Sequence, residues 1–472
     1  MQAWAYGAHS YRREHDQNGR IESHTRGSST RRLGFDLASR IVELEDADAA
    51  QAWSFDYDDA DRLTDASNAA NTGVNAQLTL GWTFDATGNR DQQTRQIGAA
   101  SPQLTDYSTE PTSNRLSSLS IDGQARARSF DAVGNTTAWT AEAGDFAGSR
   151  MRASYGGRNR LQSVSREDAG GPVRIARYAY NAFGERIAKW TGAAAIANTG
   201  APSRQYVYDD AGRLIGEYSG SGELISEHVW LDDTPVAVLK PATSPQGGQA
   251  IAASGSAPAL RAYFVHPDHL DTPRVIVNAA NQTVWRWDST PYGDTEADEN
   301  PNGLGEFSYS LRLPGQQYDG ESGQHYNYFR DYEAATGRYV QSDPIGLEGG
   351  LATYTYVESS PLDGVDPLGL WRFRDIKSCA DLGRIVRSRA HGRFTPSGSC
   401  SYCNSAAATQ RDHYWPVKMC WDAYRSGRIS LSKCIYLLNK NNLAGACGPC
   451  NRSKSGNPPT VTLPGFPTTS PF

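Results

Sequence analysis

Four cysteines near the C-terminus have the spacing of metal ligands. Cys400 and Cys403 form one C-x2-C pair, and Cys447 and Cys450 form a second one. Two such pairs present four thiolates, which suits a tetrahedral structural zinc site. All seven cysteines of the chain lie between Cys379 and Cys450, and this clustering favours a metal site over disulfides spread along a secreted chain. A redox role for the pairs would need a βαβ setting, which the surrounding sequence does not indicate.

Several polar residues lie between and directly after these cysteine pairs, and a zinc site does not explain them. They are Asp412 and His413 in RDHYWP, Asn442 in NNLAGAC, and Asn451 in CNRSK. Together with the cysteine frame, their order and spacing resemble the HNH nuclease pattern. The resemblance covers about 400–456 and implies the ββα-metal fold and hydrolysis of phosphodiester bonds.

Each of these residue types has a place in that reaction. His413, neutral near physiological pH, would take a proton from the attacking water as the general base. Asn442 would orient the imidazole ring by accepting a hydrogen bond from it. Asp412 would offer a carboxylate oxygen to a divalent cation, and Asn451 would complete the protein's hold on that ion.

Oxygen ligands of this kind favour Mg²⁺ or Mn²⁺ at the catalytic site, separate from the structural Zn²⁺. The divalent cation would stabilise the charge of the transition state and the leaving group. Arg452 and Lys454 are candidates for holding the phosphate of the substrate.

The charge of the chain divides at the same place as its cysteine usage. Residues 371–472 contain 15 Lys and Arg against 4 Asp and Glu, whereas residues 1–370 contain 31 against 48. A compact basic domain attracts polyanions, and the expected substrate is DNA rather than RNA. A zinc module that binds nucleic acid without cutting it is the alternative. A histidine beside a carboxylate favours the enzyme, because a pure binding module needs no general base.

The long acidic part of the chain contains a loose internal repeat. Each copy has an aromatic residue, then Asp or Asn, then usually Gly and a polar residue, and the copies follow at intervals of about 25 residues or twice that. Such a period indicates stacked modules, with short strands joined by hairpin turns. The copies are FDYDDADRLTDA from Phe55, FDATGNRDQQ from Phe84, FDAVGNTTAW from Phe130, YNAFGERIAKW from Tyr180 and YDDAGRLIGEY from Tyr208.

These repeats resemble the YD repeats of Rhs proteins, and the segment after them strengthens the likeness. YFVHPDHLDTPRVIVNAANQTVWRWDSTPYGD and NYFRDYEAATGRYVQSDPIGL are similar to the Rhs-associated core. The resemblance covers roughly 50–370, and 260–370 is its most specific part. It implies a β-sheet wound into a hollow shell that encloses a variable C-terminal toxin.

Two near-identical pentapeptides bracket the end of the core, DPIGL at 343–347 and DPLGL at 366–370. In Rhs proteins such a pairing resembles an intramolecular aspartyl protease that cuts just after the second motif. The resemblance therefore implies a scissile bond between Leu370 and Trp371, where charge and cysteine usage also change.

The chemistry expected of this pair is that of two neighbouring carboxyl groups. Asp343 and Asp366 could not both ionise cheaply when held together, so one would keep a proton while the other activates water. Arg338 is a candidate charge partner for them. A purely structural reading is the alternative, because Asp-Pro-x-Gly is also favourable turn chemistry.

The sequence therefore predicts a multidomain protein, with a mainly β, wound YD-repeat shell followed by a small α+β domain of the ββα-metal type with a four-cysteine zinc site. The predicted divisions are an unassigned lead-in at 1–49, YD repeats at 50–259 with a flexible insert near 241–259, the Rhs-associated core at 260–370, the HNH toxin domain at 371–456 and a Pro-rich tail at 457–472.

Delivery is predicted from absent targeting features and from the resemblance together. The first residues lack the order of a classical signal peptide, and no run approaches the roughly 18 apolar residues of a membrane span. The resemblance implies an effector for competition between bacteria, carried by secretion-apparatus components such as those of type VI secretion. It would act in the cytoplasm of the target cell, and a cognate immunity protein would protect the producer. An insecticidal toxin-complex subunit or a structural YD-repeat protein is the alternative.

Overall fold

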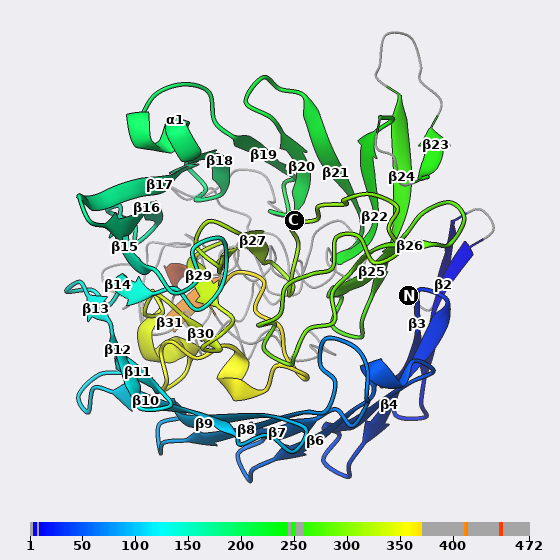
Figure 1. Ribbon diagram of the computed structural model, residues 1–472, viewed down its shortest axis with the longest axis horizontal. Coiled ribbons are helices and arrows are strands. Elements are labelled where there is room, and N and C mark those ends of the chain that lie inside the picture. Colours follow the sequence, from blue (N-terminus) through cyan, green and yellow to red (C-terminus); the bar gives the residue numbers. More distant parts are fainter. Residues whose placement is uncertain are drawn as a thin grey trace. The chain divides into compact units, whose positions relative to one another are not determined.

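The computed structural model contains two compact units, residues 1–208 with 214–373 and residues 209–213 with 374–472. The first unit is built almost wholly from antiparallel strands, which confirms the predicted β class (Figure 1). The residues that the structure describes are 3–6, 9–243, 247–251, 259–370, 410–413 and 443–446.

The first sheet is a meander of twelve described strands, in which every strand pairs with the next one along the chain. It begins within the predicted lead-in and continues into the repeats without a break at residue 49. Its strands are β1 (Ala3–Tyr6), β2 (His9–His15), β3 (Ile21–Arg26), β4 (Ser29–Phe35), β5 (Ile41–Asp46), β6 (Trp53–Tyr57), β7 (Leu63–Ser67), β8 (Leu78–Phe84), β9 (Arg90–Ile97), β10 (Gln103–Thr109), β11 (Leu116–Ile121) and β12 (Gln124–Ala127), with a 3-10 turn at Ala49–Gln51.

The second sheet continues the meander, and it also crosses the predicted boundary at residue 259 through pairing of β22 with β24. The predicted flexible insert contains β23, which pairs with β24, and the remainder of the insert lies partly outside the described residues. The elements are β13 (Ser129–Phe130), β14 (Thr136–Thr140), β15 (Arg150–Tyr155), β16 (Leu161–Asp168), β17 (Gly171–Tyr180), β18 (Arg186–Thr191), α1 (Gly192–Ala197), β19 (Arg204–Tyr208), β20 (Leu214–Tyr218), β21 (Leu224–Leu231), β22 (Thr234–Pro241), β23 (Gln249–Ile251), β24 (Leu260–Pro267), β25 (Pro273–Val277) and β26 (Thr283–Arg286).

A four-stranded sheet and long loops follow, and they lie inside the curve of the first two sheets (Figure 1). Many polar side chains of this interior segment, residues 287–370, are buried and hydrogen-bonded. Its elements are β27 (Gln317–Asp319), β28 (Gln324–Asn327), β29 (Arg330–Glu333), β30 (Arg338–Tyr339) and the 3-10 turns η2 (Gly346–Gly349) and η3 (Val357–Ser359).

Three turns of the first sheet contact the next aromatic residue along the chain through an arginine. In the turn from β6 to β7, the Arg62 Nε donates to Asp58 at 2.7 Å. The same guanidinium lies 4.8 Å from the ring centroid of Phe84 and donates to the Asp85 carbonyl at 3.2 Å. The arginine of one repeat therefore binds the aromatic-Asp step of the next repeat, and this stacks successive hairpins.

Two neighbouring repeats contain the same arrangement, which we call the turn latch. The Arg20 guanidinium lies 4.2 Å from the Phe35 ring centroid, and that of Arg40 lies 5.1 Å from the Tyr57 ring centroid. Each of these arginines also pairs with the Asp four residues before it. The latch therefore accounts for the spacing of Asp, Arg and the following aromatic residue in these three turns.

The strands of the first unit close on themselves through contacts between its earliest strands and β24. The Tyr11 hydroxyl donates to the Pro267 carbonyl at 2.9 Å, and Arg13 pairs with Asp271 at 2.7 Å. Strand β3 also contacts β24, and β12 contacts β14 on the other side. We call the contact between β2–β3 and residues 264–271 the seam.

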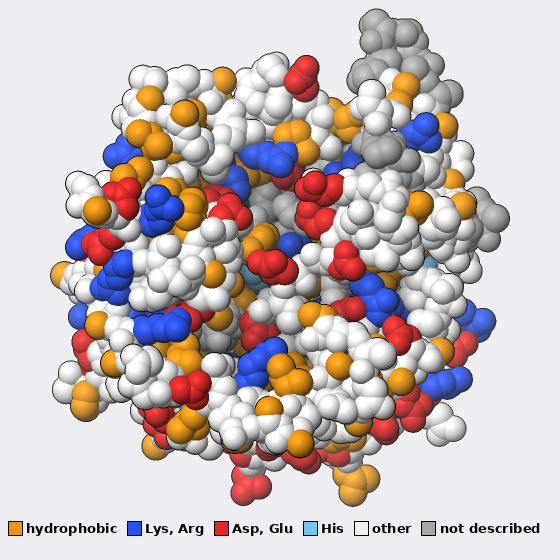
Figure 2. Space-filling model, viewed as in Figure 1, with side chains coloured by type: hydrophobic (Ala, Val, Ile, Leu, Met, Phe, Trp, Pro, Cys, Tyr) orange, Lys and Arg blue, Asp and Glu red, His pale blue; other side chains and the backbone are white. Residues whose placement is uncertain are grey.

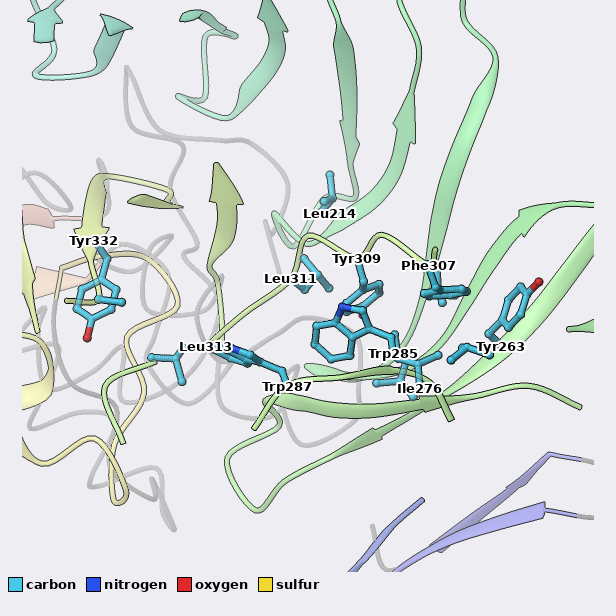
Figure 3. Packing of buried hydrophobic residues seen from close by; sticks show 14 of the residues in the cluster. Leu214, Tyr263, Ile276, Trp285, Trp287, Phe307, Tyr309, Leu311, Leu313 and Tyr332 are labelled. Atoms are coloured by element: carbon cyan, nitrogen blue, oxygen red, sulfur yellow. The ribbon is translucent and has the colours of Figure 1, made fainter. Parts of the chain in front are cut away.

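The largest hydrophobic core lies where the interior segment packs against the second sheet (Figure 3). The Trp285 ring on β26 meets Tyr309 edge-on with centroids 5.3 Å apart, and Tyr263 on β24 meets Phe307 at 4.8 Å. Burial of these large rings fixes the interior segment against the second sheet and thereby positions its later loops.

The surface of the face shown in Figure 2 mixes acidic and basic side chains, and acidic ones gather along its lower edge. This agrees with the excess of Asp and Glu over Lys and Arg in residues 1–370. Among the described residues, no helix is long and apolar enough to cross a membrane.

Candidate active site

Both Asp-Pro-x-Gly motifs fold as turns that their own aspartate side chains stabilise. The Asp343 carboxylate accepts a hydrogen bond from the Ile345 N–H at 2.9 Å, and the Asp366 carboxylate accepts one from the Leu370 N–H at 2.9 Å. In the second turn, Gly369 adopts a φ of 64°, which favours glycine. The turn chemistry of these motifs and a reactive role for their aspartates are therefore compatible.

The structure brings the two carboxylates together around one buried guanidinium, that of Arg330 at the start of β29. Its Nη2 lies 3.0 Å from the Asp343 Oδ2 and 3.3 Å from the Asp366 Oδ2. Its Nε donates to the Gly369 carbonyl at 2.5 Å, and its Nη1 donates to the Thr353 carbonyl at 3.1 Å. One side chain therefore binds both aspartates and the backbone that leads to Leu370.

Arg338, the charge partner suggested from the sequence, lies elsewhere. Its guanidinium donates to the Asn89 side chain at 3.3 Å and to the Asn114 carbonyl at 2.5 Å. Burial lowers its pKa to about 10. Arg338 therefore ties β30 to the turns of the first sheet, and Arg330 occupies the place between the carboxylates.

Tyr339 completes the surroundings of Asp366. Its hydroxyl donates to the Asp366 Oδ2 at 2.8 Å, and its ring lies 3.6 Å from the centre of the Arg330 guanidinium. Burial and the neighbouring Asp366 carboxylate raise the pKa of Tyr339 well above its usual range, so the hydroxyl keeps its proton. The site is closed to solvent, with Asp343 6% and Asp366 1% exposed.

The chain passes through this site up to Leu370, which is buried. The partner of Leu370 in the predicted scissile bond, Trp371, lies outside the described residues.

In the second unit the structure describes the backbone of two short strands, β31 (Gln410–His413) and β32 (Leu443–Ala446). They pair antiparallel, with Asp412 opposite Ala444 and His413 opposite Leu443. Asn442 directly precedes Leu443 in the sequence. The pairing thus joins the two segments in which we predict the general base and its orienting residue.

The remaining predicted residues of that domain lie outside the described residues. Among the residues that are described, no three His, Cys, Asp or Glu side chains are grouped to hold a metal ion. The predicted zinc, divalent-cation and phosphate ligands that lie outside the described residues are Cys400, Cys403, Cys447, Cys450, Asn451, Arg452 and Lys454.

The first unit thus has a closed meander wall, a packed interior segment and a carboxylate pair beside the point where the chain leaves that segment. Solved structures with a similar fold include a TcdB2-TccC3 complex and a Tc holotoxin pore. The crystal structure of TcdB2-TccC3-Cdc42 matches 80% of this chain with a TM-score of 0.57 and 16% identity, over 19% of its own length. The Tc holotoxin pore of Photorhabdus luminescens matches 78%, also with a TM-score of 0.57.

Sequence relatives point to the same kind of protein, although no known family profile matches the chain. Double-stranded DNA deaminase toxin A of Burkholderia cenocepacia is 27% identical over 386 residues, 76% of this chain and 26% of that protein. Toxin protein Tse5 of Pseudomonas aeruginosa is 32% identical over 51% of this chain and 18% of its own length. The probable deoxyribonuclease RhsA of Dickeya dadantii is 29% identical over 45% of this chain and 13% of its own length.

The chain is an Rhs-repeat protein, similar in sequence to proteins named as toxins and similar in fold to a TcdB2-TccC3 complex. It spans about a quarter or less of the length of the relatives described above.

Proposed function

We propose that this protein is an Rhs-type toxin that cuts its own chain after Leu370 and whose C-terminal domain is a divalent-metal-dependent HNH endonuclease acting on DNA. The pairing of β31 with β32 carries the nuclease part, because it sets His413 opposite the residue that follows Asn442. The strong positive charge of residues 371–472 and the deoxyribonuclease names of two relatives support the choice of DNA.

In the proposed reaction His413 takes a proton from the attacking water, and Asn442 fixes the orientation of the imidazole. Arg452 and Lys454 bind the phosphate of the substrate. The pairing of β31 with β32 would bring His413 and Asn442 near each other, since Asn442 lies one residue before β32 begins.

The donor set of the terminal domain fits two different metals. Asp412 and Asn451 offer oxygen atoms, which suit Mg²⁺ or Mn²⁺, whereas the four cysteine thiolates suit Zn²⁺. When bound, the divalent cation would stabilise negative charge on the phosphate during cleavage.

A relative named as a DNA deaminase raises a second chemistry for the terminal domain. Zinc deaminases use a glutamate as their general acid and base. Residues 371–472 contain four acidic residues, and all of them are aspartates. The sequence of this domain therefore favours hydrolysis of a phosphodiester over deamination.

The proposed setting is competition between bacteria. The chain would be delivered by secretion-apparatus components and act in the cytoplasm of the target cell, and an immunity protein would bind the terminal domain in the producer. The likeness to Tc shells favours a second candidate, a toxin-complex subunit with the same terminal enzyme.

One experiment tests the nuclease part. The full chain, freshly purified, is incubated with plasmid and Mg²⁺, with EDTA as the metal-free control. We expect His413→Ala to lower the cleavage rate about 10²–10⁴-fold while DNA binding is retained, because a positioned general base contributes that much. His391→Ala, which replaces a histidine of the same domain outside the motif, should cut like the unaltered chain. Equal cleavage by His413→Ala and the unaltered chain would refute the assignment.

A further inference from the structure

We propose that the seam between β2–β3 and residues 264–271 is an acid-sensitive closure, which opens when His24, His266 and His269 take up protons while the other strands stay paired. Three of the nine histidines of the chain lie at this one contact, whereas residues 25–227 contain none. The inference concerns the first unit alone, and it does not depend on the proposed nuclease or on the proposed self-cleavage.

One hydrogen bond across the seam exists only while His266 is neutral. The Gly27 N–H, in the turn between β3 and β4, donates to the His266 Nδ1 at 3.0 Å, and the two residues are 239 positions apart in the chain. The donor is a backbone amide, so the Nδ1 must be the acceptor, and a protonated imidazole has no accepting nitrogen. Protonation of His266 therefore breaks this bond and sets two N–H groups against each other.

The turn that contains Gly27 is packed too closely to adjust to this change. Gly27 adopts a φ of 60°, and a Cβ at this position would lie 3.3 Å from the Val275 Cγ1. His266 is 1% exposed, and its ring lies edge-on to that of Tyr11 with centroids 5.9 Å apart. Water can reach the separated groups only if the seam itself opens.

His24 lies on the β3 side of the seam and is also 1% exposed. Its ring faces Arg31 on β4 and Tyr11 on β2, and across the seam it faces Asp268 and His269. Burial holds the pKa of His24 well below its usual range, and Arg31 adds to this effect whereas Asp268 opposes it. The Nδ1 lies 3.3 Å from the carbonyl oxygen of the next residue, and the buried Nε2 has no hydrogen-bond partner among the described residues. A proton added to the Nε2 would therefore have no acceptor in the closed seam.

His269 also lies in surroundings that disfavour its charged form. Its Nε2 donates to the Leu362 carbonyl at 2.9 Å, and its buried Nδ1 has no hydrogen-bond partner within the part of the chain that the structure describes. Burial lowers the pKa of His269, and the guanidinium groups of Arg274 on β25 and Arg13 on β2 add to this effect. Asp268 and the hydrogen bond to Leu362 oppose it without cancelling it. His269 therefore takes up a proton more readily when the seam is open.

Both carboxylates of residues 264–271 already bind a guanidinium. The Arg274 Nε donates to Asp268 at 2.8 Å, and the Arg13 Nη2 donates to Asp271 at 2.7 Å. A protonated imidazole at the seam would have to share one of these carboxylates with an arginine. Protonation would therefore add positive charge beside positive charge.

An open seam places the three imidazoles in water, where each can take up a proton. The pKa of a histidine in the unfolded chain is 6.5, so the stability that these neutral histidines give to the seam is present above pH 6.5 and is lost as the pH falls below it. A histidine that only the open seam protonates raises the ratio of open to closed molecules about 10-fold between pH 7.5 and pH 5.5. Three of them raise it up to about 10³-fold. Acid alone would then open the seam, without a protease or a partner protein.

Hydrogen exchange of the full purified chain at pH 7.5 and pH 5.5, followed by mass spectrometry of its peptides, tests the proposal. The measured quantity is the protection factor, the ratio of intrinsic to observed exchange rate, because this ratio removes the effect of pH on exchange itself. We expect the protection factors of β2–β3 and of residues 264–271 to fall up to about 10³-fold at pH 5.5, and those of β15–β17 to stay nearly unchanged. An equal fall in both regions, or no fall at the seam, would overturn the proposal.

Two variants test whether the histidines are the groups that respond to acid. His266→Asn keeps an oxygen that can accept from the Gly27 N–H but does not titrate, and His24→Gln removes a second imidazole. Each should reduce the fall in protection at the seam about 10-fold. His15→Gln, which replaces an exposed histidine of β2, should leave the fall unchanged.

Each variant is compared with itself at the two pH values, so a seam that is merely weakened is distinguished from one that has lost its response to acid. If His266→Asn and His24→Gln both lose as much protection between pH 7.5 and pH 5.5 as the unaltered chain, these histidines do not control the seam and the proposal is wrong.

Discussion

A buried arginine and a buried lysine of β18 hold the interior segment of this protein in place by binding groups that are distant in sequence. Arg186 on β18 is fully buried and bonds to Asp319 and Gln317 on β27. Lys189, on the same strand, lies 2.9 Å from Asp319 and 3.1 Å from Glu321. Removing one member of such a buried pair leaves an uncompensated charge, which typically costs about 3–5 kcal/mol.

Asp331 is a buried carboxylate of the opposite kind, because burial raises its pKa to about 6. The contribution of Asp331 to stability is fully present at pH values below 3.8, the pKa of this group in the unfolded chain. It is lost as the pH rises through about 6, the pKa in the folded chain. We therefore expect Asp331→Asn to be more stable than the unaltered chain at pH 8, by about 3 kcal/mol at most, and nearly equal to it at pH 4. Thermal unfolding at both pH values measures this. Asp91→Asn, at an exposed position, should have no such effect, and a destabilised Asp331→Asn at pH 8 would contradict the prediction.

At the residue scale, the sequence predicts which aspartates meet but not the cation between them. Asp343 and Asp366 are recognisable because each begins a Pro-x-Gly turn. Arg330 carries no such local mark, and it reaches them across 13 and 36 positions of the chain through the packing of β29 beneath both turns. Arg338 is nearer to Asp343 in sequence, but its side chain points to the first sheet.

At the scale of elements, the hairpin with its turn latch is the unit from which the wall is built. Aromatic, Asp, Gly and Arg residues at fixed spacing predict the turns, because each residue has a local role in the turn conformation. The latch itself extends to the next repeat and is visible only once the strands are paired. Sequence therefore predicts the hairpins well and their stacking only through the period.

Arg62 offers a direct measurement of the latch. We expect Arg62→Ala to destabilise the chain by about 1 kcal/mol, because it loses a cation–π contact with Phe84 and a partly buried ion pair with Asp58. A double-mutant cycle with Phe84→Leu, followed by thermal unfolding, isolates the part of that loss due to the ring. Arg12→Ala, which removes an exposed pair with Glu14, serves as the control. A coupling energy of zero between Arg62 and Phe84 would rule out the latch as a stabilising contact.

At the scale of the whole shell, buried histidines set the response to acid. Burial lowers the pKa of His325 to about 3 and holds that of His24 well below its usual range. A histidine with a lowered pKa contributes its full stability at pH values above 6.5, its pKa in the unfolded chain. This stability is lost as the pH falls below 6.5, because the unfolded chain then takes up a proton that the folded chain does not. With its pKa at about 3, His325 then contributes about 2 kcal/mol less to stability at pH 5 than at pH 8.

We therefore expect the unfolding temperature to fall more steeply between pH 7 and pH 5 for the unaltered chain than for His325→Gln. The slope is the measured quantity, because the substitution also alters packing around Tyr318 and Tyr332. Parallel slopes for the two proteins would show that His325 takes up no proton on unfolding.

The seam also sets an order of events during synthesis. Almost every strand pairs with its neighbour in the chain, so the hairpins can form one after another as the residues leave the ribosome. The seam is different, because the hydrogen bond from Tyr11 cannot form until Pro267, a residue 256 positions later, has been made. The first strands therefore keep an open edge until more than half of the protein has been made. Residues 371–472 follow only afterwards, so every residue of the seam has been made before the proposed nuclease domain is complete.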